Sequence, residues 1–200
     1  MQHRFELGVE NELGLVASDA HETSATVEAR YAFANWNAIP LNPAISAEYI
    51  LGVGTSVKNA TSDKDLHRQA NAVAVWLLLG QNFGDHVGYG LNIGFQQDVS
   101  RDSGREFEIS QSVAYGAMKG KLEFGVEMRY VHNTPQRNPD ERDDLVTGPT
   151  IGWKPTRQLR ISLAPLFGCT GDSPRVATFL LVSYEFGGAE AVAAPISGNH

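Results

Sequence analysis

The stretch from Val87 to Val99 alternates between apolar and small or polar side chains. Its odd positions are apolar except for Gln97, and its even positions carry Gly, Asn, Gln and Asp. Because successive side chains of a β-strand point to opposite faces, this pattern predicts a strand with one apolar face. The usual soluble strand has about 5–6 residues, whereas a tilted strand needs roughly 9–11 to cross a bilayer. The length of this stretch therefore favours a membrane-crossing strand.

The same alternation recurs along the chain and predicts about ten strands in all. One stretch, residues 71–79, is apolar at both parities; the better fit points its odd-numbered residues outward and Ala72 and Ala74 inward. The other strands are expected at residues 4–16, 26–33, 45–57, 106–117, 121–130, 145–153, 159–167 and 176–186.

The links between these strands alternate in character. Every second link is charged, namely SDAHETS, KNATSDKDLH, SRDSGR, TPQRNPDERDD and CTGDSP. The links between them are short or fixed by proline, namely NWNAIPLNP, GQNFGDH, MKGK and KPTRQ. Outer-membrane barrels place long polar loops outside and short turns on the periplasmic side. We therefore expect residues 1–187 to form an all-β, antiparallel, up-and-down transmembrane β-barrel of about ten strands, with part of a twelve-stranded barrel as the alternative. Residues 188–200 are expected to form a disordered tail.

Composition narrows the class of protein. The longest apolar run, residues 72–79, is much shorter than the roughly 18 residues of a membrane helix. A net charge of −7 argues against nucleic-acid binding, and a single Cys169 excludes an internal disulfide. Residues 1–3 lead directly into an alternating stretch without a secretory signal, so an exported chain is expected to be a mature or truncated form.

In each predicted strand, the alternate positions that are not apolar mix glycines with charges of both signs. This mixture suits the interior of a small barrel. About eight strands just fill with side chains, so a narrow or plugged lumen is the default expectation for ten. An acidic excess at this parity predicts a preference for cations. The residues expected to line the lumen and set its selectivity are Glu106, Glu108, Glu123, Glu127, Arg129 and Arg160.

Candidate chemistry is sparse. His132 lies near acids at the outer end of a strand, an arrangement that more often marks a solvated surface histidine than a catalytic one. The six histidines show no metal-ligand spacing, and the glycine-rich GVG and GYG stretches are followed by no helix pattern. The acidic run at residues 138–144 reads as a solvated loop rather than a divalent-cation site bridging lipopolysaccharide. We predict no catalytic residues, no metal site, no cofactor and no enzymatic activity.

The stretch VATFLLVSYEFG at residues 176–187 resembles the closing strand of bacterial outer-membrane β-barrels, except that residues follow its final aromatic. This resemblance implies recognition by the barrel-assembly machinery. More loosely, GPTIGWKPTRQLRISLAPLFGCTGDSP at residues 148–174 resembles the MetA-pathway phenol-degradation or transporter-like family of outer-membrane proteins. That family implies passive uptake of small molecules and supplies no site residues.

The sequence thus predicts a porin-like protein of the bacterial outer membrane that lets small solutes pass or binds them. Its expected partners are outer-membrane lipid, lipopolysaccharide, the assembly machinery and a small-molecule solute. Two alternatives stay open: a structural barrel with a plugged lumen and partner-facing loops, and a soluble ligand-binding β-barrel.

Overall fold

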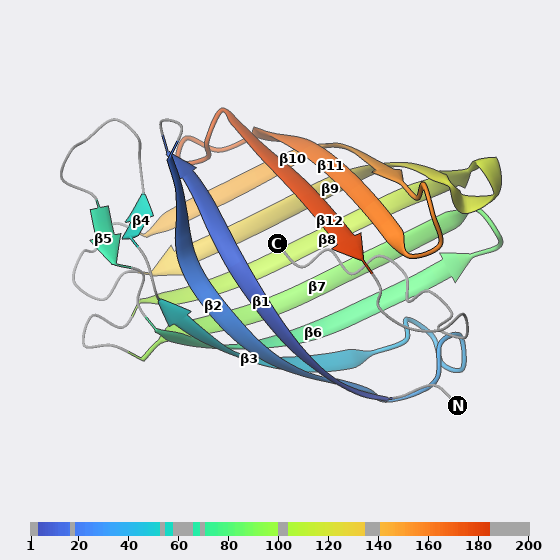
Figure 1. The fold of residues 1–200 in the computed structure, drawn as a ribbon, viewed down its shortest axis with the longest axis horizontal. Coiled ribbons are helices and arrows are strands. Elements are labelled where there is room, and N and C mark those ends of the chain that lie inside the picture. Colours follow the sequence, from blue (N-terminus) through green and yellow to red (C-terminus); the bar gives the residue numbers. More distant parts are fainter. Residues whose placement is uncertain are drawn as a thin grey trace.

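The computed structural model describes residues 4–16, 19–52, 55–57, 66–68, 71–99, 104–134 and 141–184 (Figure 1). The described chain is almost entirely β-structure, with a single 3₁₀ turn, η1 (Met118–Gly120), in the link between two strands. The strands are β1 (Phe5–Val16), β2 (Asp19–Ala32), β3 (Ala44–Gly52), β4 (Thr55–Val57), β5 (Leu66–Arg68), β6 (Ala72–Phe83), β7 (Val87–Asp98), β8 (Arg105–Ala117), β9 (Leu122–Thr134), β10 (Arg142–Trp153), β11 (Leu159–Gly168) and β12 (Val176–Tyr184).

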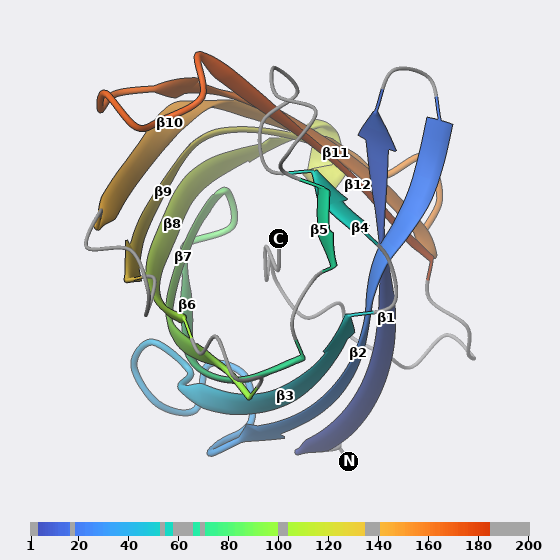
Figure 2. The same ribbon diagram turned by 90° about the vertical axis from the view of Figure 1, so that its left-hand side faces the viewer.

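Ten of these strands form one antiparallel sheet in the order β1-β2-β3-β6-β7-β8-β9-β10-β11-β12, and β4 and β5 form a separate two-stranded sheet. Each long strand pairs with its neighbour in the chain, which confirms the predicted up-and-down arrangement. The sheet curves strongly round on itself, seen end-on in Figure 2. The predicted closure is not observed: within the described residues, no ladder joins β1 to β12, so the sheet is strongly curved but is not a closed barrel.

The side chains divide between the two faces of this sheet as the alternation predicts. In β6, Val75 is 50% exposed while Ala74 is 2% exposed; in β3, Ile45 is 42% exposed while Ser46 is 1% exposed. Residues of the buried parity meet across the concave side, where Leu166 of β11 and Glu108 of β8 line the same cavity. We call the concave side the inner face and the apolar, exposed side the outer face.

The links between strands define two ends of the sheet. Residues 169–175 lie at one end, the loop end, together with β4, β5 and the strand ends near Val16, Asp19, Gly104 and Glu141 (Figure 1). The shorter links 84–86, 118–121 and 154–158, together with residues 33–43, lie at the other end, the turn end. Phe5 and Tyr184 both lie at the turn end, as an even number of strands requires.

Several predicted links are wrong in part; for example, residues 80–83, expected in a link, belong to β6. Residues 19–24, interpreted as a polar loop, belong to β2 and pair with residues 12–16 of β1. The long charged loop expected from residue 134 is shortened because β10 begins at Arg142. Continued backbone pairing with the neighbouring strand outweighs the polar composition of these segments. The expected disordered tail, residues 188–200, lies outside the described residues.

The link between β2 and β3 folds back onto β6. The Gly80 amide donates to the Leu41 carbonyl at 2.7 Å, and Asn42 Nδ2 donates to the Gly80 carbonyl at 2.7 Å. Leu41 and Asn42 have positive φ angles of 59° and 38°, which turn the chain toward β6. These contacts fix the longest link of the turn end against the sheet.

The inner face is not uniformly polar. Ile50, Ala72 and Ala74 form one buried apolar cluster with Trp76, on β3 and β6. A second buried cluster, on β10 and β11, consists of Val146, Ala164 and Leu166, and the partly buried Phe179 of β12 packs against it. No helix among the described residues has the length and apolar character needed to cross a membrane.

Candidate functional site: the inner face

A buried ion pair lies at the middle of the inner face. Arg129 Nη2 donates to Glu108 Oε2 at 2.7 Å, with 26% and 6% of the two side chains exposed. The pair is diagonal across two strands, because Glu108 lies opposite Val131 and Arg129 lies opposite Ser110 in the β8–β9 register. A carboxylate this well buried is expected to need a charged partner, and the guanidinium supplies it. The buried Arg129 Nε has no hydrogen-bond partner among the described residues.

A second ion cluster lies toward the turn end. Glu123 Oε2 accepts from Arg160 Nη2 at 2.7 Å, and Glu123 Oε1 lies 2.9 Å from Lys154 Nζ. Arg160 reaches from β11 to β9 across Gly152 of β10. A Cβ atom at Gly152 would lie 3.1 Å from Glu123 Oε2, so the absence of a side chain there leaves room for the pair.

The two remaining predicted residues differ in their contacts. Glu106 Oε2 accepts from Asn133 Nδ2 at 3.3 Å. Glu127 lies opposite Ser112 on one side and Gly148 on the other; its carbonyl accepts from Thr147 Oγ1, but its carboxylate has no ion-pair or hydrogen-bond partner among the described residues. Among the acids of the predicted set, Glu127 is therefore the one whose carboxylate has no polar contact among the described residues.

A cavity of about 40 Å³ lies where the inner faces of β7, β8 and β9 meet those of β11 and β12. Glu108, Glu127 and Arg129 line it, together with polar Asn92, Ser110 and Ser112. Leu166 and Phe179 contribute its apolar side. One water needs a cavity volume of about 10–15 Å³, so this cavity has room for a few waters or for a ligand of similar size. The structure thus gathers three of the six predicted residues around one cavity; Glu123 and Arg160 form a separate cluster, and Glu106 lies outside both.

Sequence reasoning missed part of the inner face. Glu28 Oε1 accepts from Arg30 at 2.8 Å and from Ser46 Oγ at 2.6 Å, which makes a third polar cluster on β2 and β3. The inward parity of Glu28 and Arg30 was the available signal. Lys154 lies in a predicted turn, so only the tertiary structure shows that its side chain reaches Glu123.

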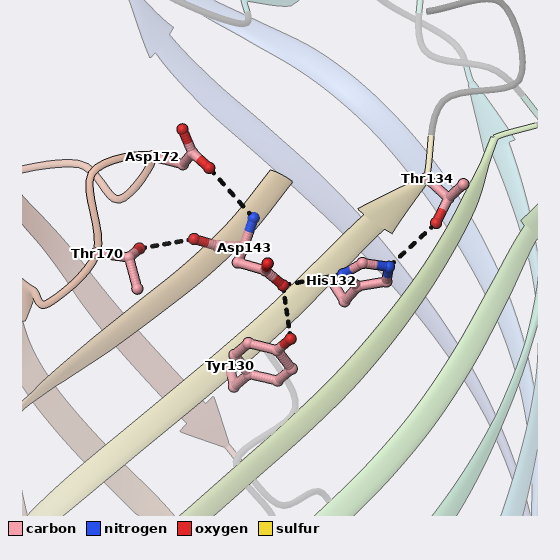
Figure 3. A network of polar contacts seen from close by, with 6 residues as sticks. All are labelled: Tyr130, His132, Thr134, Asp143, Thr170 and Asp172. Carbon is pink, nitrogen blue, oxygen red and sulfur yellow. Dashed lines mark hydrogen bonds and ion pairs between the residues drawn. The ribbon is translucent and has the colours of Figure 1, made fainter. Parts of the chain in front are cut away.

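A polar network lies on the outer face at the loop end and is drawn in Figure 3. Asp143 Oδ1 accepts from Tyr130 Oη at 2.6 Å and lies 2.9 Å from His132 Nδ1, and His132 Nε2 lies 3.2 Å from Thr134 Oγ1. Thr170 Oγ1 donates to the Asp143 carbonyl at 2.6 Å, which ties the β11–β12 link to β10. The network thus joins β9, β10 and this link at the loop end, and we call it the rim network.

The rim network has the order of groups found in hydrolytic triads, but it lies on the face opposite the cavity, and Asp143 is more than half exposed. We assign it a structural role in holding the loop end together. Within the part of the chain that the structure describes, no group of three His, Cys, Asp or Glu residues is placed to hold a metal ion.

Comparison of the chain with protein-family models and with curated proteins gave no match.

Proposed function

We propose that this chain forms a β-barrel of the bacterial outer membrane whose lumen lets small solutes pass or binds them. The observation that carries the proposal is the outer face, on which large apolar side chains stand exposed along all ten strands of the sheet. Contiguous exposed apolar surface larger than a few hundred Å² marks an interaction site. A protein partner would cover a patch, whereas lipid covers a band that runs around the whole sheet.

The strand lengths agree with a bilayer. A strand of 12 residues such as β7 is about 40 Å long. A tilt of about 40° reduces its height to about 30 Å, which is enough to span an apolar band of about 25 Å. Outward aromatic residues at the turn end, such as Phe83 and Trp153, suit the headgroup level.

Lipid also imposes closure. No water in the hydrocarbon core satisfies backbone groups, so the free edges of β1 and β12 need partners there. The two strands run in opposite directions, which permits direct antiparallel pairing. In hydrogen–deuterium exchange of the protein in lipid vesicles, the amides of β1 and β12 are expected to be protected as well as those of β7. Unprotected edges would contradict closure.

The inner face supports cation-preferring passage, because Glu127 is unneutralised beside a paired Glu108 and Arg129. The test is conductance of the purified chain in planar bilayers under a potassium chloride gradient. The expected result is a reversal potential shifted toward that of potassium. Conductance without selectivity, or selectivity for chloride, would contradict the proposal.

The alternative function is a structural barrel with a plugged lumen. The two short ion pairs at Glu108 and Glu123, and the apolar cluster that includes Leu166 and Phe179, favour it by filling the interior. A chain that inserts into bilayers without conducting would decide for this function. In both cases lipid, lipopolysaccharide and the assembly machinery, acting on the terminal strand β12, are the proposed partners.

A further inference from the structure

The cavity of the inner face combines groups of three kinds on opposing walls. One wall carries the carboxylate of Glu127 and the hydroxyls of Ser110 and Ser112; the facing wall carries Leu166 and the ring of Phe179. Gly148 lies opposite Glu127 in β10, and an added Cβ there would run into the backbone at Pro165 and Leu166, so glycine lets β11 approach closely beside the cavity. The cavity is therefore polar and anionic on one side and apolar on the other.

The charges that line the cavity do not cancel. Glu108 and Arg129 neutralise each other at 2.7 Å, and Glu127 adds one negative charge with no partner among the residues described. A net charge of −1 in a partly enclosed space attracts a monovalent cation more strongly than the same charge in open water.

The remaining groups distinguish between monovalent cations. Carboxylate and hydroxyl oxygens accept N–H hydrogen bonds, and an aromatic ring attracts an ammonium group within about 6 Å of its centre. An alkali ion instead prefers a shell made of oxygen alone, which the Leu166 and Phe179 wall does not complete. The size of about 40 Å³ admits a few non-hydrogen atoms.

We propose that this cavity is a binding site for a small primary ammonium cation, with Glu127 as the residue that determines specificity. The inference deepens the proposed function, on which it rests, by naming the class of solute. The ammonium group binds Glu127 and the serine hydroxyls, and its short alkyl part packs against Leu166 and Phe179.

The test measures binding without transport. The protein in detergent micelles is titrated with methylammonium chloride, and the line width of ¹³C-labelled methylammonium reports binding. Glu127→Gln is expected to weaken this binding about tenfold, since a hydrogen bond to a charged group is lost. Glu141→Gln, which removes one exposed acid at the loop end, is the matched control and is expected to bind as the unmodified chain does.

The titration is repeated in the presence of potassium chloride, at constant ionic strength, to measure how well potassium competes with methylammonium for the site. Weak competition by potassium supports the proposal, whereas potassium that displaces methylammonium at equal concentration overturns its specificity for ammonium. Binding that is unchanged in Glu127→Gln also overturns the site, even where bilayer conductance is cation-selective, in which case the proposed function stands without this inference. Binding by Glu127 in a chain that does not conduct would keep the site and reject passage.

Discussion

The two faces of the same strands reverse the arrangement of an ordinary soluble domain. In β8, the carboxylate-bearing Glu108 is 5% exposed, and the adjacent Phe107 is 37% exposed. In a water-soluble sheet with one wet face, the phenyl ring would face the core and the carboxylate would face water. The proposed membrane barrel accounts for this difference, because its outer face would meet lipid and its inner face pairs Glu108 with Arg129.

The largest expected effect comes from placing a charge on the outer face. Leu77 lies mid-strand in β6 between Ile45 and Ile93, so under the proposed function arginine there would meet the hydrocarbon. Leu77→Arg is expected to lower the free energy of unfolding in lipid vesicles by about 2–4 kcal/mol. Phe83→Arg, at the turn end of the same strand, is the control, with an expected loss of about 0–1 kcal/mol. Denaturant unfolding in vesicles measures both, and equal small losses would indicate that the outer face meets water.

Breaking the central pair tests the inner face. Glu108→Gln leaves the largely buried Arg129 without its ionic partner and is expected to lower the free energy of unfolding by about 1.5–3 kcal/mol. The double variant Glu108→Gln/Arg129→Met removes both charges and is expected to recover part of that loss. The same unfolding experiment compares the two. A single variant as stable as the unmodified chain would show that the pair is solvated.

A smaller effect is expected where the inner face needs space. Gly152→Ala would bring a Cβ to 3.1 Å from Glu123 Oε2, against the pair with Arg160. The expected loss is about 1 kcal/mol, because the carboxylate must shift. Gly171→Ala is the control, since nothing lies within 4 Å of its added Cβ. Thermal unfolding that ranks the two variants in the opposite order would reject the crowding argument.

The sequence predicted those features that depend on local alternation. The alternation of apolar and polar residues predicted most strands and the face to which their side chains point. Ala72 and Ala74, expected to point inward, are 1% and 2% exposed. The same pattern misassigned residues 19–24, because their polar composition resembles a loop while their backbone pairs with β1.

Contacts between distant strands could not be read from local alternation. Arg160 meets Glu123 across an intervening strand, and Leu166 meets the β7–β9 wall only because the whole sheet curves. The sequence therefore proposed six lumen residues as one set, whereas the structure divides them between a cavity, an ion cluster and a separate hydrogen bond to Asn133.

The orientation of the two faces can be measured with the tryptophans that lie on them. Trp153 is half exposed on the outer face, whereas Trp76 points inward over Gly94. Two single-tryptophan chains, Trp36→Phe/Trp76→Phe and Trp36→Phe/Trp153→Phe, are inserted into vesicles of lipids brominated near the headgroup. Bromine is expected to quench the fluorescence of Trp153 strongly and that of Trp76 little. If Trp153 is not quenched by bromine but is quenched by aqueous acrylamide, the outer face does not lie in lipid, and the proposed function is wrong.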